Sequence, residues 1–201
     1  MSDRTLPARS RALARLGRDL HGRGWLPATS GNLSARLESG NILITASGRH
    51  KGRLGRDDVL EVDLEGRPVS SGSRPSAETL LHMARYRADP KIEAVFHVHS
   101  PYATLVSLRP EPELVLRGYE LLKAFPGIDT HEAELRVPVF PNDQDMARLS
   151  ARVDAWRATG PFYGYLIAGH GLYAWGDSLD DAMRHIEAFD FLFHCTILSR
   201  T

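Results

Sequence analysis

The sequence predicts a one-domain α/β protein with a central, mostly antiparallel sheet flanked by helices. First, 201 residues with 42% hydrophobic side chains can bury one sizeable core. Second, runs with strand-like and helix-like periodicity are intermixed, without the strict alternation of repeated βαβ units. Third, no repeat, low-complexity segment or long linker divides the chain. We therefore treat residues 1–201 as a single domain.

Residues 1–100 begin with a predicted helix at 6–20, where leucines recur at helical spacing after the expected N-cap Thr5. Strands follow, because the β-rich runs NLSARL, NILITA and VLEVDL are separated by turn residues. Ser76 is the expected N-cap of a helix over residues 77–86. A further strand ends near His97 and His99.

The second half continues this mixture of strands and short helices. We expect a strand at 114–116, a short helix at 118–125, and a strand RVPVF whose proline suits a sheet edge or strand end. Asn142 is the expected cap of a helix reaching about Trp156, and two strands meet at 169–171. The last helix, 179–198, is apolar nearly all round toward its end, which indicates deep burial or a subunit interface.

Composition excludes several kinds of partner. Lys and Arg number 25, and so do Asp and Glu, so no net charge points to nucleic acid or an anionic membrane. No apolar stretch approaches the ~20 residues that span a bilayer, and the N-terminus lacks the apolar region of a secretory signal. The single cysteine, Cys195, permits no internal disulfide and lies in an apolar run that suits core or interface. We expect a cytoplasmic protein.

The stretch EAVFHVHSPYAT contains the first candidate for chemistry. On a strand, His97 and His99 share one face, while Ala94, Phe96 and Val98 pack on the other. Such a pair can bind one metal ion, although two histidines at this spacing are also ordinary on a half-buried strand. His170, between two glycines that permit close backbone approach, is the candidate third ligand. Three histidines with an open fourth position are typical of catalytic zinc.

Three short stretches have the small hydroxyls and glycines of a phosphate site, namely Thr-Ser-Gly-Asn at 29–32, Thr-Ala-Ser-Gly at 45–48 and Pro-Ser-Ala at 75–77. Each alone is an ordinary polar turn; Lys51, just after the second, adds charge. Two carboxylates are candidate acids or bases. Glu78 lies in the first turn of its helix, where the helix macrodipole alone would favour a carboxylate. Glu120 lies in RGYELLKAF, and the sequence alone favours a solvated residue there, on an exposed short helix.

These blocks, in this order, resemble the class II aldolase/adducin family. The matching stretches are SGNLSAR, ITASG, PSAE, HVHSPYAT and GHGLYAWG, which span about residues 30–176. Further stretches, including ITASGRHKGRL and GYELLKAFPGIDTHE, are similar to the branch that dehydrates 5-methylthioribulose 1-phosphate. The resemblance implies a three-layer αβα fold and a homotetramer with sites near subunit boundaries.

The resemblance also implies roles for individual residues. His97, His99 and His170 would bind one Zn²⁺, and Glu120 would be the acid/base of the dehydrating branch. Glu78 matches the acid/base of the family's aldolases, and Ala77 replaces the second hydroxyl of their PSSE motif. The residues that match phosphate-binding positions are Gly31, Asn32, Ser47, Gly48 and Ser76.

The function implied is zinc-dependent dehydration of 5-methylthioribulose 1-phosphate to 2,3-diketo-5-methylthiopentyl 1-phosphate in methionine salvage. Two alternatives stay open. The first is an aldolase or epimerase of another sugar phosphate, which uses the same metal-supported chemistry. The second is a non-catalytic, adducin-like assembly module, which would not need the three histidines.

Overall fold

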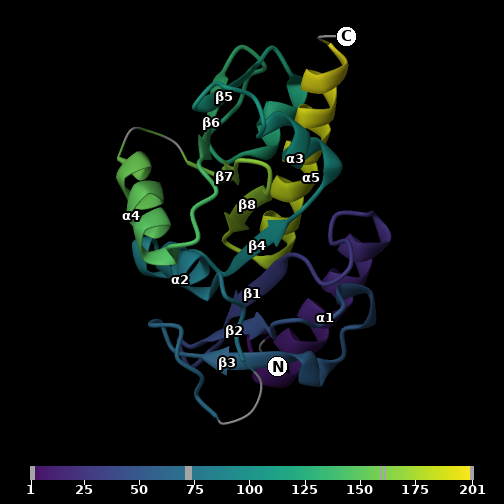
Figure 1. Ribbon diagram of the computed structural model, residues 1–201, viewed down its shortest axis with the longest axis vertical. Coiled ribbons are helices and arrows are strands. Elements are labelled where there is room, and N and C mark those ends of the chain that lie inside the picture. The colour runs from purple at the N-terminus through teal and green to yellow at the C-terminus, as the bar shows by residue number, and fades with distance from the viewer. Residues whose placement is uncertain (1–2, 71–73, 159, 161, 200–201) are drawn as a thin grey trace.

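The computed structural model describes residues 3–70, 74–158, 160 and 162–199. In this part of the chain, eight strands form one sheet with helices on both faces (Figure 1). Neighbouring strands are antiparallel, except that β6 and β7 run parallel. The predicted α/β architecture with a mostly antiparallel sheet is confirmed. The strand order is β3 (Val59–Val62), β2 (Ile42–Thr45), β1 (Asn32–Arg36), β4 (Ala94–Val98), β8 (Gly171–Gly176), β7 (Gly164–Ile167), β6 (Glu134–Phe140) and β5 (Glu113–Arg117).

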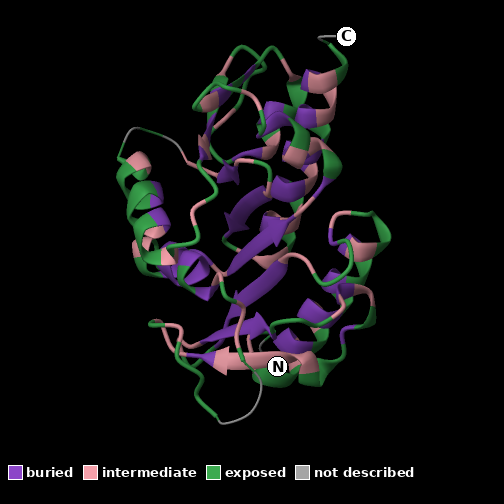
Figure 2. Ribbon diagram, viewed as in Figure 1, coloured by how far each residue is buried: buried purple, intermediate pink, exposed green. Residues whose placement is uncertain are grey.

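Each face of the sheet has its own hydrophobic core, so the domain has three layers. One core includes side chains of α1 (Leu6–Gly22), α3 (Pro101–Val106) and α5 (Leu179–Leu198). The other includes side chains of α2 (Thr79–Ala88) and α4 (Met146–Arg157). The strands between the two cores are the buried centre of the molecule (Figure 2).

Strand β4 contributes to both cores through the alternation that the sequence predicts. Ala94, Phe96 and Val98 lie in the core of α1, α3 and α5, and Val95 lies in the core of α2 and α4. Because side chains alternate along a strand, His97 shares the face of Val95. The predicted placement of His97 on the face opposite Ala94, Phe96 and Val98 is therefore confirmed.

Two predicted helix starts are wrong by a few residues. α2 begins at Thr79 with Glu78 at its N-cap, so Ser76 does not cap the helix. The Ser76 hydroxyl instead accepts a hydrogen bond from the Glu78 amide at 3.3 Å, within the turn that precedes the helix. The cap of α4 is Asp145, whose carboxylate accepts from the Arg148 amide, and not Asn142.

Two other local expectations also need correction. The short helix predicted at 118–125 is a 3-10 helix, η3 (Glu120–Ala124). The proline of RVPVF, Pro138, does not lie on an edge strand, because β6 lies between β5 and β7. It is tolerated because β7 pairs only with Val139 and Phe140 of β6, so no hydrogen bond to β7 is lost at Pro138.

The last helix, α5, has one side buried against the sheet and another exposed. Ile186, Phe189 and Phe193 are fully buried, whereas Phe191 is 53% exposed and Leu198 is 61% exposed. Among the described residues, no helix is long and apolar enough to span a membrane. Two more 3-10 helices, η1 (Lys51–Arg53) and η2 (Arg56–Asp58), connect β2 to β3.

Candidate active site

A cavity of about 400 Å³ lies at one end of the sheet, where several strands begin or end. Residues that are far apart in the sequence meet there, because β1 and β8 begin at this end while β2, β4, β6 and β7 end at it. The cavity is lined by Thr29, Ser30, Gly31, Asn32, Ala46, Ser47, Gly48, Lys51, Ser76, Ala77, Glu78, His99, Asn142, Asp143, Gln144, Met146, Leu149, Ile167 and His170.

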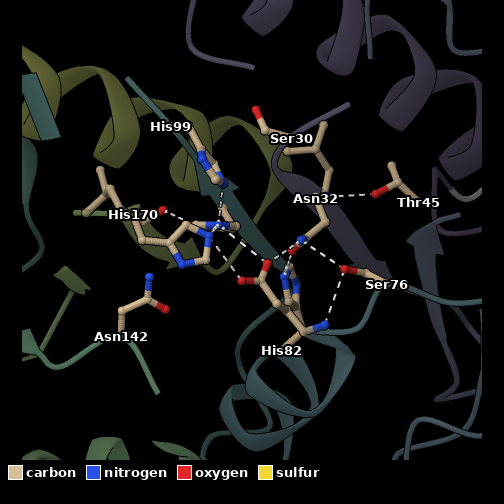
Figure 3. Close-up of polar contacts among 12 residues, drawn as sticks. Ser30, Asn32, Thr45, Ser76, His82, His99, Asn142 and His170 are labelled. Atoms are coloured by element: carbon tan, nitrogen blue, oxygen red, sulfur yellow. Dashed lines mark hydrogen bonds and ion pairs between the residues drawn. The ribbon is translucent and has the colours of Figure 1, made fainter. Parts of the chain in front are cut away.

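The three predicted metal ligands lie together. The Nε2 atoms of His99 and His97 are 2.9 Å apart, and those of His97 and His170 are 3.3 Å apart. Each histidine offers one ligand nitrogen, and all three lie within 4.8 Å of one another. Figure 3 shows the rings of His99 and His170 directed to the same point. Nitrogens about 2.1 Å from a tetrahedral ion lie about 3.4 Å apart, so this spacing fits one metal ion.

The glycines beside His170 are required by the backbone. Gly169 has a φ of +63°, which most side chains disfavour. A Cβ at Gly171 would lie 2.2 Å from the carbonyl oxygen of Val98 in the neighbouring strand. The turn can therefore bring His170 beside β4 only if both neighbours lack side chains, which confirms the interpretation of GHG as a close-approach turn.

His97 and His99 are held as neutral imidazoles, the form that binds metal. The Nδ1 atom of His97 lies 3.0 Å from the carbonyl oxygen of Leu172; it donates this bond, leaving the Nε2 lone pair for the site. Burial lowers the pKa of His97 to about 4. Burial, together with the neighbouring His97 and His170, lowers the pKa of His99 to about 3. Neither His97 nor His99 therefore has a proton to displace when a divalent metal binds at neutral pH.

Glu78 points at the same position as the histidines. Its Oε2 lies 3.4 Å from His97 Nε2, and its Oε1 lies 3.3 Å from His170 Nε2. Burial opposes ionisation, but the charge interaction with His97 and a hydrogen bond from Asn32 outweigh it and lower the pKa of Glu78 to about 2. Glu78 is therefore an ionised carboxylate inside the site.

The three predicted phosphate-binding turns all line the cavity, on the side of the triad away from Asn142 (Figure 3). Gly31, Ser47, Gly48 and Ser76 lie on this wall. Lys51 is also there. It is only 2% exposed, and its ammonium group donates to the carbonyl oxygens of Thr29 at 2.8 Å and Arg49 at 2.9 Å.

Burial lowers the pKa of Lys51 to about 8, although the negative charge of Glu78 acts in the opposite direction. The Asn32 amide faces inward instead, donating to Glu78 at 2.7 Å and to Ser76 at 3.0 Å. Asn32 thus links the wall that contains the predicted phosphate-binding turns to the carboxylate.

Glu120 is not brought to this cavity by its own chain. Its side chain is 73% exposed and forms an ion pair with Lys123 at 2.6 Å, and that hydrogen bond lowers the pKa of Glu120. None of the cavity-lining residues comes from η3. The prediction that Glu120 belongs to the site is not met within one chain.

Sequence reasoning missed one wall of the cavity and one buried residue behind it. Asn142, Asp143 and Gln144 follow β6 and line the cavity with apolar side chains of α4 and β7. Asn142 resembled a helix cap, and the composition gave no other signal. His82, on α2, is fully buried and contacts Asn32. A single histidine within a helix gives no signal of such a contact.

The chain is similar to several known proteins over nearly its whole length. Residues 11–197 match the family described as class II aldolase and adducin N-terminal domain. A methylthioribulose-1-phosphate dehydratase of Pseudomonas paraeruginosa is 56% identical over 183 residues, which cover 90% of this chain and 89% of that protein. The Azotobacter vinelandii protein of the same name is 53% identical over 193 residues, covering 95% and 94%.

Solved structures share the fold at lower identity. YgbL of Klebsiella pneumoniae has a TM-score of 0.83 at 27% identity, covering 96% of this chain and 90% of that one. L-fuculose-1-phosphate aldolase of Thermus thermophilus has a TM-score of 0.77 at 28% identity, covering 96% of both chains.

Proposed function

Because the chain belongs to the class II aldolase and adducin family, we propose that its cavity dehydrates 5-methylthioribulose 1-phosphate. On this proposal the chain is a lyase, like the methylthioribulose-1-phosphate dehydratases to which it is similar. The proposed product is 2,3-diketo-5-methylthiopentyl 1-phosphate. This is a step of methionine salvage. The observation that carries the proposal is the single cavity in which a histidine triad, an ionised carboxylate and phosphate-binding turns meet.

His97, His99 and His170 would hold the metal, for which we propose Zn²⁺ because three neutral imidazoles suit this ion. When bound, it supplies Lewis-acid polarisation of the substrate's C2 carbonyl and C3 hydroxyl, which acidifies the C3 hydrogen. The Leu172 carbonyl oxygen fixes the orientation of the His97 ring, so the triad is arranged before substrate arrives.

The phosphate would bind on the wall formed by Gly31, Ser47, Gly48 and Ser76. Small residues allow backbone N–H groups to approach an anion closely, and Lys51 adds a buried positive charge. With its phosphate on this wall and C2 and C3 at the triad, the substrate's methylthio end points to the opposite wall.

That opposite wall contains Met146, Leu149 and Ile167. Leu149 and Ile167 are almost completely buried, and Met146 is partly exposed. Apolar side chains, with one adaptable methionine, suit a thioether tail. We assign this wall to the methylthio group. Met146→Gln should lower kcat/KM for 5-methylthioribulose 1-phosphate about tenfold. The same substitution should change kcat/KM for ribulose 1-phosphate much less, and an equal loss of kcat/KM for both substrates would contradict the assignment.

Glu120 is proposed as the acid/base that takes the C3 proton and returns a proton to the C4 hydroxyl, which leaves as water. It is exposed on its own chain, so it would act in the site of a neighbouring subunit of a homotetramer. The test mixes two inactive variants, His97→Ala and Glu120→Gln, under conditions that exchange subunits. If Glu120 acts between subunits, about one site in four regains both groups and activity returns. If the mixture stays inactive after proven exchange, this role of Glu120 is wrong.

One observation favours a second candidate, an aldolase of another sugar phosphate. Glu78, which matches the acid/base of the family's aldolases, contacts the triad, whereas Glu120 does not. Incubation with 5-methylthioribulose 1-phosphate, with and without chelator, separates the two. The dehydratase forms the diketone in a chelator-sensitive reaction. Two shorter carbon fragments, or no diketone from metal-loaded enzyme, would refute the proposed function.

A further inference from the structure

A chain of buried polar side chains runs behind the cavity, from the core to Glu78. Tyr86, Ser34, His82 and Asn32 are each at most 4% exposed. The Ser34 hydroxyl lies 2.8 Å from the Tyr86 hydroxyl and 2.7 Å from His82 Nδ1. His82 Nε2 contacts Asn32 Oδ1 closely, and Asn32 Nδ2 lies 2.7 Å from Glu78 Oε2 (Figure 3).

From Glu78 back to His82 the partners fix the direction of each hydrogen bond, and the Ser34 hydroxyl lies nearer to His82 Nδ1, at 2.7 Å, than to the Val95 carbonyl oxygen, at 3.3 Å. The NH₂ group of Asn32 donates to Glu78 and to Ser76, so its carbonyl oxygen is the atom that faces His82. That oxygen only accepts, so His82 must donate from Nε2. A neutral imidazole carries one N–H, so its Nδ1 accepts from Ser34, whose oxygen then accepts from Tyr86.

This series of hydrogen bonds has two consequences at the cavity: it orients the Asn32 amide, and it leaves the Ser76 O–H free to donate. One N–H of the Asn32 amide donates to Glu78 and the other donates to Ser76 at 3.0 Å. The Ser76 oxygen also accepts from the Glu78 amide, so its own O–H remains available to donate to a substrate phosphate. A flipped Asn32 amide would instead place its carbonyl oxygen against the Glu78 carboxylate, which is repulsive.

We propose that His82 is a positioning residue whose Nε2–H tautomer fixes the Asn32 amide and, through it, the carboxylate of Glu78 and the hydroxyl of Ser76. The proposal rests on the proposed function only for its kinetic readout. His82 touches neither the metal position nor the cavity, so its effect on the reaction passes through Asn32.

The competing explanation is that His82 only fills the core. The chain offers a matched control in His185, which is 3% exposed and whose Nδ1 lies 2.6 Å from the carbonyl oxygen of Trp175. Its ring packs near Phe125 and it has no hydrogen bond to any member of the chain from Tyr86 to Glu78. His185→Leu removes a buried histidine of the same kind without touching the positioning path.

The kinetic experiment compares His82→Leu, His82→Gln and His185→Leu in metal-loaded enzyme. A misplacement of about 1 Å at a reacting group costs up to about 100-fold, so His82→Leu should lower kcat about 10- to 100-fold. KM should rise less, and the metal content should stay that of wild type. His82→Gln, whose amide can donate to Asn32, should recover most of kcat, and His185→Leu should keep it. Equal kcat in His82→Leu and wild type, or no recovery in His82→Gln, would overturn the proposal.

Two further measurements keep the proposal testable if His82→Leu does not fold. Ser34→Ala removes the donor to His82 Nδ1 and should also lower kcat, although Ser34 does not line the cavity. In ¹⁵N NMR spectra of the wild-type protein, His82 should be the neutral Nε2–H tautomer. An Nδ1–H tautomer would refute the mechanism. This readout needs no substrate, so it is independent of whether the proposed dehydration is correct.

Discussion

Acidification should unfold the metal-free protein partly through His82. This histidine is fully buried, and burial lowers its pKa from 6.5 to about 4, opposed in part by the negative charge of Glu78. Because the folded-state pKa is depressed, the unfolded chain takes up the proton first. The contribution of His82 to the free energy of unfolding is complete above about pH 6.5 and is lost progressively as the pH falls toward 4.

The magnitude follows from the two pKa values. The gap between 6.5 and 4 corresponds to about 3 kcal/mol of unfolding free energy, of which about 2 kcal/mol is lost between pH 7 and pH 5. His97 and His99 have depressed pKa values as well and add losses of the same sign. The loss of unfolding free energy on acidification, compared between wild type and His82→Gln, isolates the contribution of His82, since both proteins keep the other histidines.

The assay is urea unfolding followed by tryptophan fluorescence, in chelator and at one fixed protein concentration, at pH 7 and pH 5. His82→Gln should be less stable than wild type at pH 7 but should lose about 2 kcal/mol less on acidification. The prediction concerns the change in unfolding free energy between pH 7 and pH 5, and not the unfolding free energy at either pH. Equal losses in the two proteins would show that His82 titrates alike in the folded and unfolded chains, and the reasoning would fail.

Three more predictions concern the cavity. His170→Ala should abolish metal retention after dialysis, as measured by elemental analysis, and turnover with it; a full complement of metal would contradict the triad. Lys51→Met should raise KM about 10- to 100-fold with a smaller effect on kcat, because a charged hydrogen bond is worth about 1.5–3 kcal/mol. Gly31→Ala should destabilise the fold by more than 2 kcal/mol, roughly, because its Cβ would lie 2.7 Å from the His97 carbonyl oxygen. Gly40→Ala is its control, with a similar φ and open space, and equal losses of unfolding free energy would contradict the steric argument.

Local periodicity predicted the parts of the site that depend on local backbone geometry. His97 and His99 share a face because strand side chains alternate, and this holds in any sheet that contains the strand. Gly169 and Gly171 indicated close approach because glycine has few other advantages in that position. The composition of the three polar turns that line the cavity was visible in the sequence, although only the resemblance to the family placed them together.

The remaining parts depend on contacts between distant segments. Asn142 and Ile167 reach the cavity because β6 and β7 end beside it, and no local pattern encodes that neighbourhood. His82 contacts Asn32 across 50 residues of sequence, so its role depends on the packing of α2 against β1. The errors at Ser76 and Asn142 have a related cause. A short polar side chain can cap a helix or face a ligand, and sequence alone does not distinguish these uses.

The strand order gives a physical reason why Glu120 does not reach the cavity of its own chain. η3 follows β5, which is the edge strand, and three other strands lie between β5 and β4, which carries His97. At about 4.8 Å per strand, β5 is roughly 19 Å from β4 across the sheet, far beyond the reach of a glutamate side chain. A movement of η3 within the same chain would have to break its packing through the buried Leu122 and Phe125. If Glu120 acts in the reaction, a neighbouring chain could therefore supply it without breaking the packing of η3, whereas its own chain could not.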